Sequence, residues 1–273
     1  FKLVIIPDLH LQNKKIYMKA QSQFINWFCA QDFNNENNIF LSLGDFFESK
    51  IIYPDVISQA IDFLQNRCKF KEMLILSGNN NHEYNFHKKT WAIQSLENLE
   101  RIKIVLKPEQ IKIDNLSISL LPWMPDYFLN KKLKMKDYYL TEQKEDDYFF
   151  THLNTEESYF NDFIDLKSKF LNTRLVSGHI HSKNLGICIP QNYGERNFTG
   201  KVMIIDTETK EESFIEIPRF IKFDTLEYPE IKKVDLNKEN IIFDIDNAPD
   251  KNTAIDFYTK EDGDNFYYRQ INN

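Results

Sequence analysis

The stretch LILSGNNNHEYN, residues 74–85, is an apolar run that ends at a glycine and continues into three asparagines, a histidine and a glutamate. The run has the character of a buried strand, and Gly78 ends it. A polar turn after a strand would explain the asparagines, because asparagine tolerates left-handed backbone angles. A functional alternative is that one asparagine oxygen and one imidazole bind a metal and a phosphate. The ends of the other strands bear on that choice.

Short apolar runs recur along the chain and predict a sheet. We expect strands at Lys2–Pro7, Ile39–Leu43 and Met73–Ser77. Apolar residues recur at helical spacing in the two segments between them, Lys19–Gln31 and Pro54–Gln65. This alternation predicts an α/β fold with helical crossovers. Two packed sheets are expected, because the second half adds strands at Ile102–Leu106, Leu116–Leu121, Asp147–Thr151, Leu175–Gly178, Val202–Asp206 and Ser213–Ile217.

The composition is that of a soluble globular protein. Hydrophobic residues make up 42% and charged residues 27%, and no apolar run approaches the roughly 20 residues that span a bilayer, so no membrane association is expected. Three scattered cysteines without a C-x-x-C pair favour reduced thiols and a cytoplasmic location. A net charge of −7 argues against a protein that coats nucleic acid by bulk electrostatics.

Pro218 and Phe220 mark a predicted domain boundary. We expect residues 1–219 to form the main domain and residues 220–273 to form a partial, β-rich small domain. The second segment contains β-like stretches at Ile221–Tyr228 and Ile241–Ile245. It is too short for an independent core, so it is expected to pack against the main domain.

Aspartate, asparagine and histidine residues directly follow five of the predicted strands. The chain has six histidines, and five of them lie at these strand ends, with His87 as the exception. In open α/β sheets, ligands bind beyond the carboxyl ends of the strands. Each residue alone is weak evidence, but the ordered set predicts a metal centre. Its members are Asp8, His10, Asp45, the asparagines before His82, His82 itself, His152, His179 and His181.

These residue types suit a binuclear centre. One carboxylate must bridge two cations roughly 3.5–4 Å apart, with nitrogen and oxygen ligands completing each coordination sphere. Two cations lower the pKa of a shared water and bind the phosphate oxygens, and a further histidine can donate a proton to the leaving oxygen. The absence of a ligating cysteine argues against a structural zinc site.

The set resembles the signature of calcineurin-like metallophosphoesterases, in the form Asp8-x-His10, Gly44-Asp45, Asn81-His82-Glu83, His152 and Gly178-His179-x-His181. The resemblance covers residues 1 to about 218 and implies a four-layer αββα sandwich. It also implies two divalent cations, with manganese expected and magnesium, iron or zinc as alternatives. One cation would be bound by Asp8, His10, Asp45 and His181. The other would be bound by the bridging Asp45, Asn81, His152 and His179, with His82 as the proton donor.

The asparagine stretch departs from the family pattern. Family members usually read G-N-H-[DE], whereas two residues intervene here between Gly78 and Asn81. Asn81 keeps its adjacency to His82, which lets neighbouring side chains reach the metal and the phosphate, while Asn79 keeps its place after the glycine. We expect Asn81 to be the ligand, with Asn79 as the alternative.

Several details resemble the DNA-repair nuclease branch, meaning SbcD-type and phage recombination endonuclease subunits. Residues 44–48 (GDFFE) are similar to the branch's G-D-hydrophobic-F-[DE], and residues 121–124 (LPWM) to a segment of the phage subunits. Residues 189–195 are similar to its loop ending in G-E, and the tail from Ile221 to the start of its DNA-capping domain. The branch implies DNA as substrate, an SbcC-type SMC-like ATPase as partner, and a homodimer as an option.

The first hypothesis is therefore a binuclear-metal-dependent DNA nuclease, with endonuclease or 3'–5' exonuclease activity. Six lysines are the expected DNA contacts, although a solvated face would also explain them. They are Lys14, Lys15, Lys131, Lys132, Lys134 and Lys136. The alternative is a metal-dependent phosphatase or phosphodiesterase acting on small molecules or phosphoproteins. A catalytically inactive scaffold is the third hypothesis.

Overall fold

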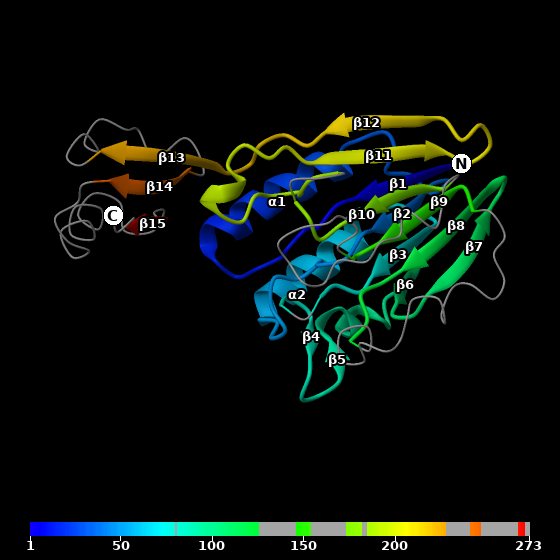
Figure 1. The fold of residues 1–273 in the computed structure, drawn as a ribbon, viewed down its shortest axis with the longest axis horizontal. Helices are drawn as coiled ribbons and strands as arrows, with labels where there is room; N and C mark the ends of the chain where they lie inside the picture. Colours follow the sequence, from blue (N-terminus) through cyan, green and yellow to red (C-terminus); the bar gives the residue numbers. More distant parts are fainter. Residues whose placement is uncertain are drawn as a thin grey trace.

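The computed structural model describes residues 1–79, 81–125, 146–153, 173–181, 185–227, 241–246 and 267–270. Within these ranges the fold is mixed α/β, with sheets and few helices, which confirms the predicted class (Figure 1). Each predicted strand is present, with bounds that differ from the prediction by no more than one residue. The sequence did not predict the polar edge strand β7, the short hairpin β4–β5, or β15.

A six-stranded sheet forms the centre of the molecule, in the order β12-β11-β1-β2-β3-β6. Strands β1, β2, β3 and β6 run parallel to one another, whereas β11 is antiparallel to both of its neighbours, β1 and β12. The bounds are β1 (Lys2–Ile6), β2 (Ile39–Ser42), β3 (Glu72–Leu76), β6 (Ile102–Val105), β11 (Lys201–Asp206) and β12 (Glu212–Glu216). The carboxyl ends of β1, β2 and β3 therefore lie at one edge of the sheet.

Helices cover one face of this sheet (Figure 1). Helix α1 spans Lys15–Cys29, and α2 spans Pro54–Ile61 and continues as a π-helical turn, η1 (Asp62–Arg67). Pro54 suits the first turn of α2, where the missing N–H has no helical partner. Apolar residues on α1 and η1, among them Phe24, Phe28 and Phe63, pack against Phe40 of β2.

A four-stranded sheet covers the opposite face, in the order β10-β9-β8-β7. Its strands are β7 (Glu109–Ile113), β8 (Leu116–Leu121), β9 (Tyr148–Thr151) and β10 (Arg174–Ser177). Strand β1 explains the layering, because its side chains alternate between faces. Val4 and Ile6 pack on the helix side, while Leu3 and Ile5 pack between the two sheets. The described residues thus form three layers: helices, a six-stranded sheet and a four-stranded sheet.

Smaller elements complete the described chain. The hairpin of β4 (Tyr84–Asn85) and β5 (Thr90–Trp91) is followed by the 3₁₀ turn η2 (Ala92–Leu96), and a second 3₁₀ turn, η3, spans Tyr193–Glu195. A third sheet contains β13 (Lys222–Glu227), β14 (Ile241–Asp246) and β15 (Tyr267–Gln270). No described helix has both the length and the apolar character needed to cross a membrane. The predicted division at residue 219 stays a prediction.

Candidate metal centre

Both sheets place polar side chains beyond the carboxyl ends of their parallel strands. In the six-stranded sheet, β1, β2 and β3 are adjacent and parallel, and in the four-stranded sheet, β9 and β10 are adjacent and parallel. The predicted site residues follow these strands. They are Asp8 and His10 after β1, Asp45 after β2, His82 and an asparagine (Asn81, with Asn79 as the alternative) after β3, His152 after β9, and His179 and His181 after β10. The structure brings these residues together into one largely buried cluster.

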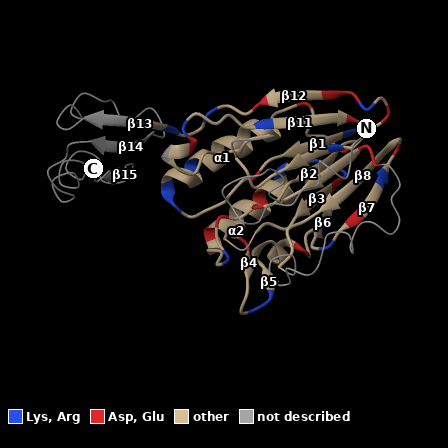
Figure 2. Cartoon of the chain, in the orientation of Figure 1, with Lys and Arg blue, Asp and Glu red and all other residues tan. Residues whose placement is uncertain are grey.

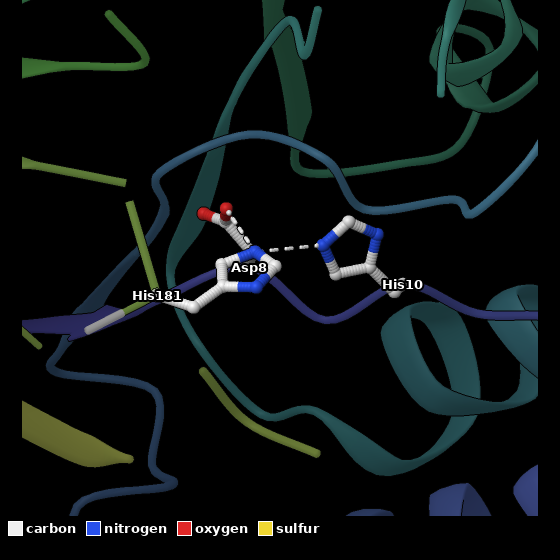
Figure 3. Close-up of side chains that lie close together, drawn as sticks. All are labelled: Asp8, His10 and His181. Atoms are coloured by element: carbon white, nitrogen blue, oxygen red, sulfur yellow. Dashed lines mark hydrogen bonds and ion pairs between the residues drawn. The ribbon is translucent and has the colours of Figure 1, made fainter. Parts of the chain in front are cut away.

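The first ligand group consists of Asp8, His10 and His181, whose ligand atoms lie within 4.8 Å of one another. His181 Nε2 lies 3.2 Å from Asp8 Oδ2 and 3.1 Å from His10 Nε2. Figure 3 shows the two imidazoles and the carboxylate converging on one point. Asp8 and His10 are fully buried, so neither is hydrated by bulk water.

The second ligand group consists of Asp45, His152 and His179, which meet the same 4.8 Å limit. His152 Nε2 lies 3.1 Å from Asp45 Oδ2, and the rings of His152 and His179 are 5.3 Å apart at their centroids. His152 Nδ1 donates to the Leu43 carbonyl at 2.8 Å. Because a carbonyl can only accept, a hydrogen is on Nδ1, and Nε2 is the ring nitrogen that faces the cluster and can bind a cation once it has lost its own proton.

Asp45 connects the two groups. It also forms a third set with His10 and His82 in which the ligand atoms lie within 4.8 Å. Asp45 is therefore within this distance of a histidine from the first group and of both histidines of the second. This is the placement that a bridging carboxylate requires.

The structure places Asn79 in the cluster and leaves the predicted Asn81 outside it. Asn79 is 2% exposed, and its Nδ2 lies 2.8 Å from Asp45 Oδ2 and 3.0 Å from His179 Nδ1. Asn81 is exposed, and its backbone N–H donates to Asn79 Oδ1 at 2.7 Å. The backbone N–H of Glu83 donates to the Asn79 carbonyl at 2.9 Å, which holds these two residues together. Adjacency to His82 does not bring Asn81 into the cluster, because His82 lies beside the cluster while Asn81 is exposed. For the amide to bind a cation, Oδ1 would have to take the place of Nδ2.

A glycine is needed at position 78, just after β3. A Cβ at this position would overlap Asp45 Oδ1 and approach the Asp45 backbone nitrogen at 2.5 Å. Only glycine lets β3 end directly against the central carboxylate. The backbone of the cluster is itself unusual, because His10, Asp45 and His179 have φ values of 53°, 41° and 70°. Left-handed conformations cost on the order of 1–3 kcal/mol each in non-glycine residues and gather at functional sites.

His82 lies beside the cluster and is partly open to solvent. Its side chain is 26% exposed, and its Nε2 is 3.9 Å from Asp45 Oδ2. Its Nδ1 lies 3.1 Å from the carbonyl of Glu48 and 3.3 Å from the Glu48 carboxylate. Burial opposes protonation, but these contacts and the charge of Asp45 raise the pKa of His82 to about 9. The imidazole therefore carries a proton at neutral pH and presents Nε2 to the cluster.

Three carboxylates that were not among the predicted site residues surround the cluster. Glu48 Oε2 lies 2.8 Å from His10 Nδ1, and Glu195 Oε1 accepts a hydrogen bond of 2.8 Å from His181 Nδ1. Glu83 accepts from the backbone N–H of Phe47 at 2.9 Å and of Gly78 at 2.7 Å, so it joins the loops that follow β2 and β3. Burial raises the pKa of Glu83 to about 7, and the charge of Asp45 adds to the effect. Glu48, Glu83 and Glu195 all stand in stretches that resembled family motifs, which was the available sequence signal.

The charges of the cluster stabilise one another. Burial disfavours the ionised forms of Asp8 and Asp45, but the neighbouring His152 and, at Asp8, His181 hold both pKa values below the ordinary value. Burial also opposes protonation of His152, yet Asp45 and Asp8 raise its pKa to about 9. Asp8 and Glu195 raise the pKa of His181 to about 10 against the same penalty. In the metal-free protein, protons therefore provide the positive charge that two carboxylates require.

The donor set fits divalent cations. Asp8 Oδ1 is buried and makes no hydrogen bond to any described residue, and unpaired buried oxygens are costly. The Nε2 atoms of His10 and His181 face each other at 3.1 Å. Two ring nitrogens at this distance attract each other only if a proton or a cation lies between them. Carboxylate oxygens and imidazole nitrogens suit manganese, iron or zinc.

The predicted DNA contacts are placed only in part. Lys14 and Lys15 are exposed where the chain enters α1, and Lys14 Nζ lies 5.7 Å from the centroid of the Tyr17 ring. Lys131, Lys132, Lys134 and Lys136 lie outside the described residues. Basic and acidic residues are scattered over the described elements (Figure 2). The LPWM segment is buried, with Trp123 packed against Tyr84, so these two side chains serve the core.

No protein-family model and no curated protein matches this sequence. What the cluster does must therefore be inferred from its geometry and from the motifs that its residues form.

Proposed function

We propose that this protein is a calcineurin-like metallophosphoesterase that hydrolyses phosphodiester bonds in DNA with two divalent cations. The observation that carries the proposal is the placement of Asp45 between two histidine-containing ligand groups. A binuclear centre needs one carboxylate within reach of both cations, and isolated metal sites do not. The three described layers are consistent with the αββα sandwich of that family.

The ligands follow from the two groups. The first cation would be bound by Asp8, His10 and His181 with Asp45, and the second by His152 and His179 with Asp45 and Asn79. When bound, the cations lower the pKa of a water and stabilise negative charge on the phosphate oxygens. The protein contributes a buried site whose ligand nitrogens are already oriented, which reduces the cost of assembling the centre.

His82 is the proposed proton donor. Its Nδ1 is oriented by Glu48, its Nε2 faces the cluster, and its partial exposure leaves it accessible to a substrate. Nε2 is the ring nitrogen through which His82 would donate a proton to the leaving oxygen, since its Nδ1 lies against Glu48. The His82 ring packs edge-on against His10 at 4.5 Å between centroids, and His82 is assigned to neither proposed coordination sphere.

DNA is proposed as the substrate because residues 44–48 and 121–124 resemble the DNA-repair nuclease branch, and because Lys14 and Lys15 are exposed shortly after His10. Exposed lysines suit contacts to backbone phosphates. By the same resemblance we propose an SMC-like ATPase as partner.

The test is hydrolysis by the purified protein with manganese. The substrates are labelled single-stranded DNA, labelled double-stranded DNA, a chromogenic phosphodiester and a chromogenic phosphomonoester. We expect cleavage of DNA and of the diester that stops with chelator and returns with Mn²⁺. Turnover of the monoester without nicking of DNA would instead support a phosphatase. Absence of both hydrolysis and Mn²⁺ binding would support a scaffold.

A further inference from the structure

Glu195 faces the outer nitrogen of His181. It lies at the end of the 3₁₀ turn η3, and its side chain is 11% exposed. Its Oε1 accepts a hydrogen bond of 2.8 Å from His181 Nδ1. Nδ1 carries the hydrogen, because a carboxylate oxygen accepts. Nε2, which faces Asp8 and His10, is therefore the nitrogen left to bind a cation after it loses its proton. One contact thus fixes which nitrogen keeps its hydrogen and the direction of the ring.

Glu195 is itself held in place. Its Oε1 also accepts from Asn192 Nδ2 at 3.0 Å, and its Oε2 accepts from the backbone N–H of Gln191 at 2.6 Å. Gln191 is in turn bonded through its carbonyl to Tyr17 Oη at 2.7 Å, and through its side chain to Gln12. The carboxylate is therefore rigidly connected to α1 and to the segment that follows His10.

His152, in the second ligand group, has a neutral carbonyl as its nearest outer partner, and the Asp8 carboxylate lies farther from its Nδ1, at 3.7 Å. His152 Nδ1 donates to the neutral carbonyl of Leu43. A carboxylate partner makes an imidazole a stronger electron donor than a carbonyl partner does, and such outer partners affect metal affinity strongly. The environment of His181 is thus suited to tight binding of a cation in a way that the environment of His152 is not.

We propose that Glu195 is a positioning residue that orients His181 and strengthens cation binding at the first ligand group. This inference rests on the proposed binuclear centre. Glu195 does not touch the reacting atoms in this role, because His181 lies between it and the cluster.

Glu195→Gln tests the proposal with little change in size. Three donors point at the two carboxylate oxygens, and an amide offers only one acceptor oxygen, so at least one donor loses its partner. Metal-free protein is titrated with Mn²⁺, and the EPR signal of free Mn²⁺ counts the bound ions. We expect two ions in the wild type, and one of the two weakened about 10–100-fold in Glu195→Gln.

The matched control is Glu212→Gln. Glu212 accepts from Tyr148 Oη at 2.7 Å and pairs with Arg174 at 2.8 Å, and none of these residues is a proposed ligand. This variant should bind both ions as the wild type does. The melting temperature of each metal-free variant shows whether the fold is intact.

A second comparison separates orientation of His181 from general support of the loop. In a His181→Ala background, Glu195→Gln should cause no further loss of Mn²⁺ binding, because its target is already gone. A further loss in this double variant would overturn the proposed role. Wild-type affinity at both sites in Glu195→Gln would overturn the role of Glu195 alone. Failure of the wild type to bind Mn²⁺ would overturn the metal centre together with this inference.

Discussion

The two ligand groups differ most in what lies behind their histidines. In the first group, Glu48 lies 2.8 Å from His10 Nδ1 and Glu195 accepts a hydrogen bond from His181. In the second group, His152 donates to the neutral Leu43 carbonyl. His10 and His181 therefore have anionic outer partners at 2.8 Å, whereas the outer partner of His152 at that distance is a neutral carbonyl.

This difference teaches that two sites with the same ligand types need not have the same affinity. An anionic outer partner raises the basicity of an imidazole and favours a bound cation. Asp45 belongs to the proposed spheres of both cations, so the asymmetry must come from the remaining ligands and their partners. We expect the first group to fill at a lower Mn²⁺ concentration than the second.

Asp45→Asn should have the largest effect, because it removes the carboxylate that both ligand groups share. Asparagine tolerates the left-handed backbone that Asp45 adopts, at φ 41°, so the fold should survive. We expect both ions to be lost and hydrolysis to fall on the order of 10³-fold, since cations supply several kcal/mol of transition-state stabilisation. Asp147→Asn is the control, because Asp147 pairs with Lys210 at 2.7 Å, away from the cluster. Two bound ions in Asp45→Asn would contradict the bridge.

His82→Ala should separate chemistry from cation binding, because His82 belongs to neither ligand group. We expect hydrolysis of the chromogenic diester to fall by about 10²-fold or more, the usual contribution of a general acid. Mn²⁺ stoichiometry should stay at the wild-type value. His87→Ala is the matched control, since His87 is exposed and its backbone N–H bonds to Asn85. A large loss of bound Mn²⁺ in His82→Ala would show that His82 is a ligand.

Asn79→Ala and Asn81→Ala form a matched pair that sharpens the contrast at the second group. Asn79 lies against Asp45 and His179, whereas Asn81 is exposed. We expect Asn79→Ala to weaken one Mn²⁺ ion by about 10–100-fold. Asn81→Ala should change little. The Mn²⁺ titration measures both affinities. A larger loss of Mn²⁺ affinity in Asn81→Ala than in Asn79→Ala would make Asn81 the ligand.

The smallest expected effect is that of pH on the stability of the metal-free protein, because protons on the histidines occupy the place of the cations. The pKa values of His152 and His181, one from each group, are raised from 6.5 to about 9 and about 10. A histidine with a raised pKa stabilises the fold fully below pH 6.5 and loses this contribution as the pH rises through the folded value. Metal-free protein should therefore melt at lower temperature at pH 10 than at pH 6.5.

Mn²⁺ binding must displace the same protons, because a ligand nitrogen needs its lone pair. Calorimetric titration at pH 7.5 in two buffers of different ionisation enthalpy measures this release. A binding enthalpy that does not depend on the buffer would contradict proton displacement.

The local pattern of the sequence was enough to place most elements. Apolar runs such as those around Leu3 and Leu74 predicted strands within one residue, because burial on both faces leaves no other position for such a run. Strand β7 was missed because alternating polar and apolar residues at a sheet edge give a weak signal. The hairpin β4–β5 is too short to show a period.

The sequence by itself determined which residue types stand at the strand ends, because a strand's length and apolar character fix where it stops. It therefore predicted Asp8, Asp45, His152 and His181 as neighbours. It did not determine which asparagine lies inside, since that depends on contacts such as the bond from the Glu83 N–H to the Asn79 carbonyl. The partners Glu48 and Glu195 were likewise decided only by tertiary structure. His10 and Glu48 are 38 residues apart in the sequence, and His181 and Glu195 are 14 apart. Such contacts depend on how the chain folds between the two residues, which local hydrophobic periodicity does not predict.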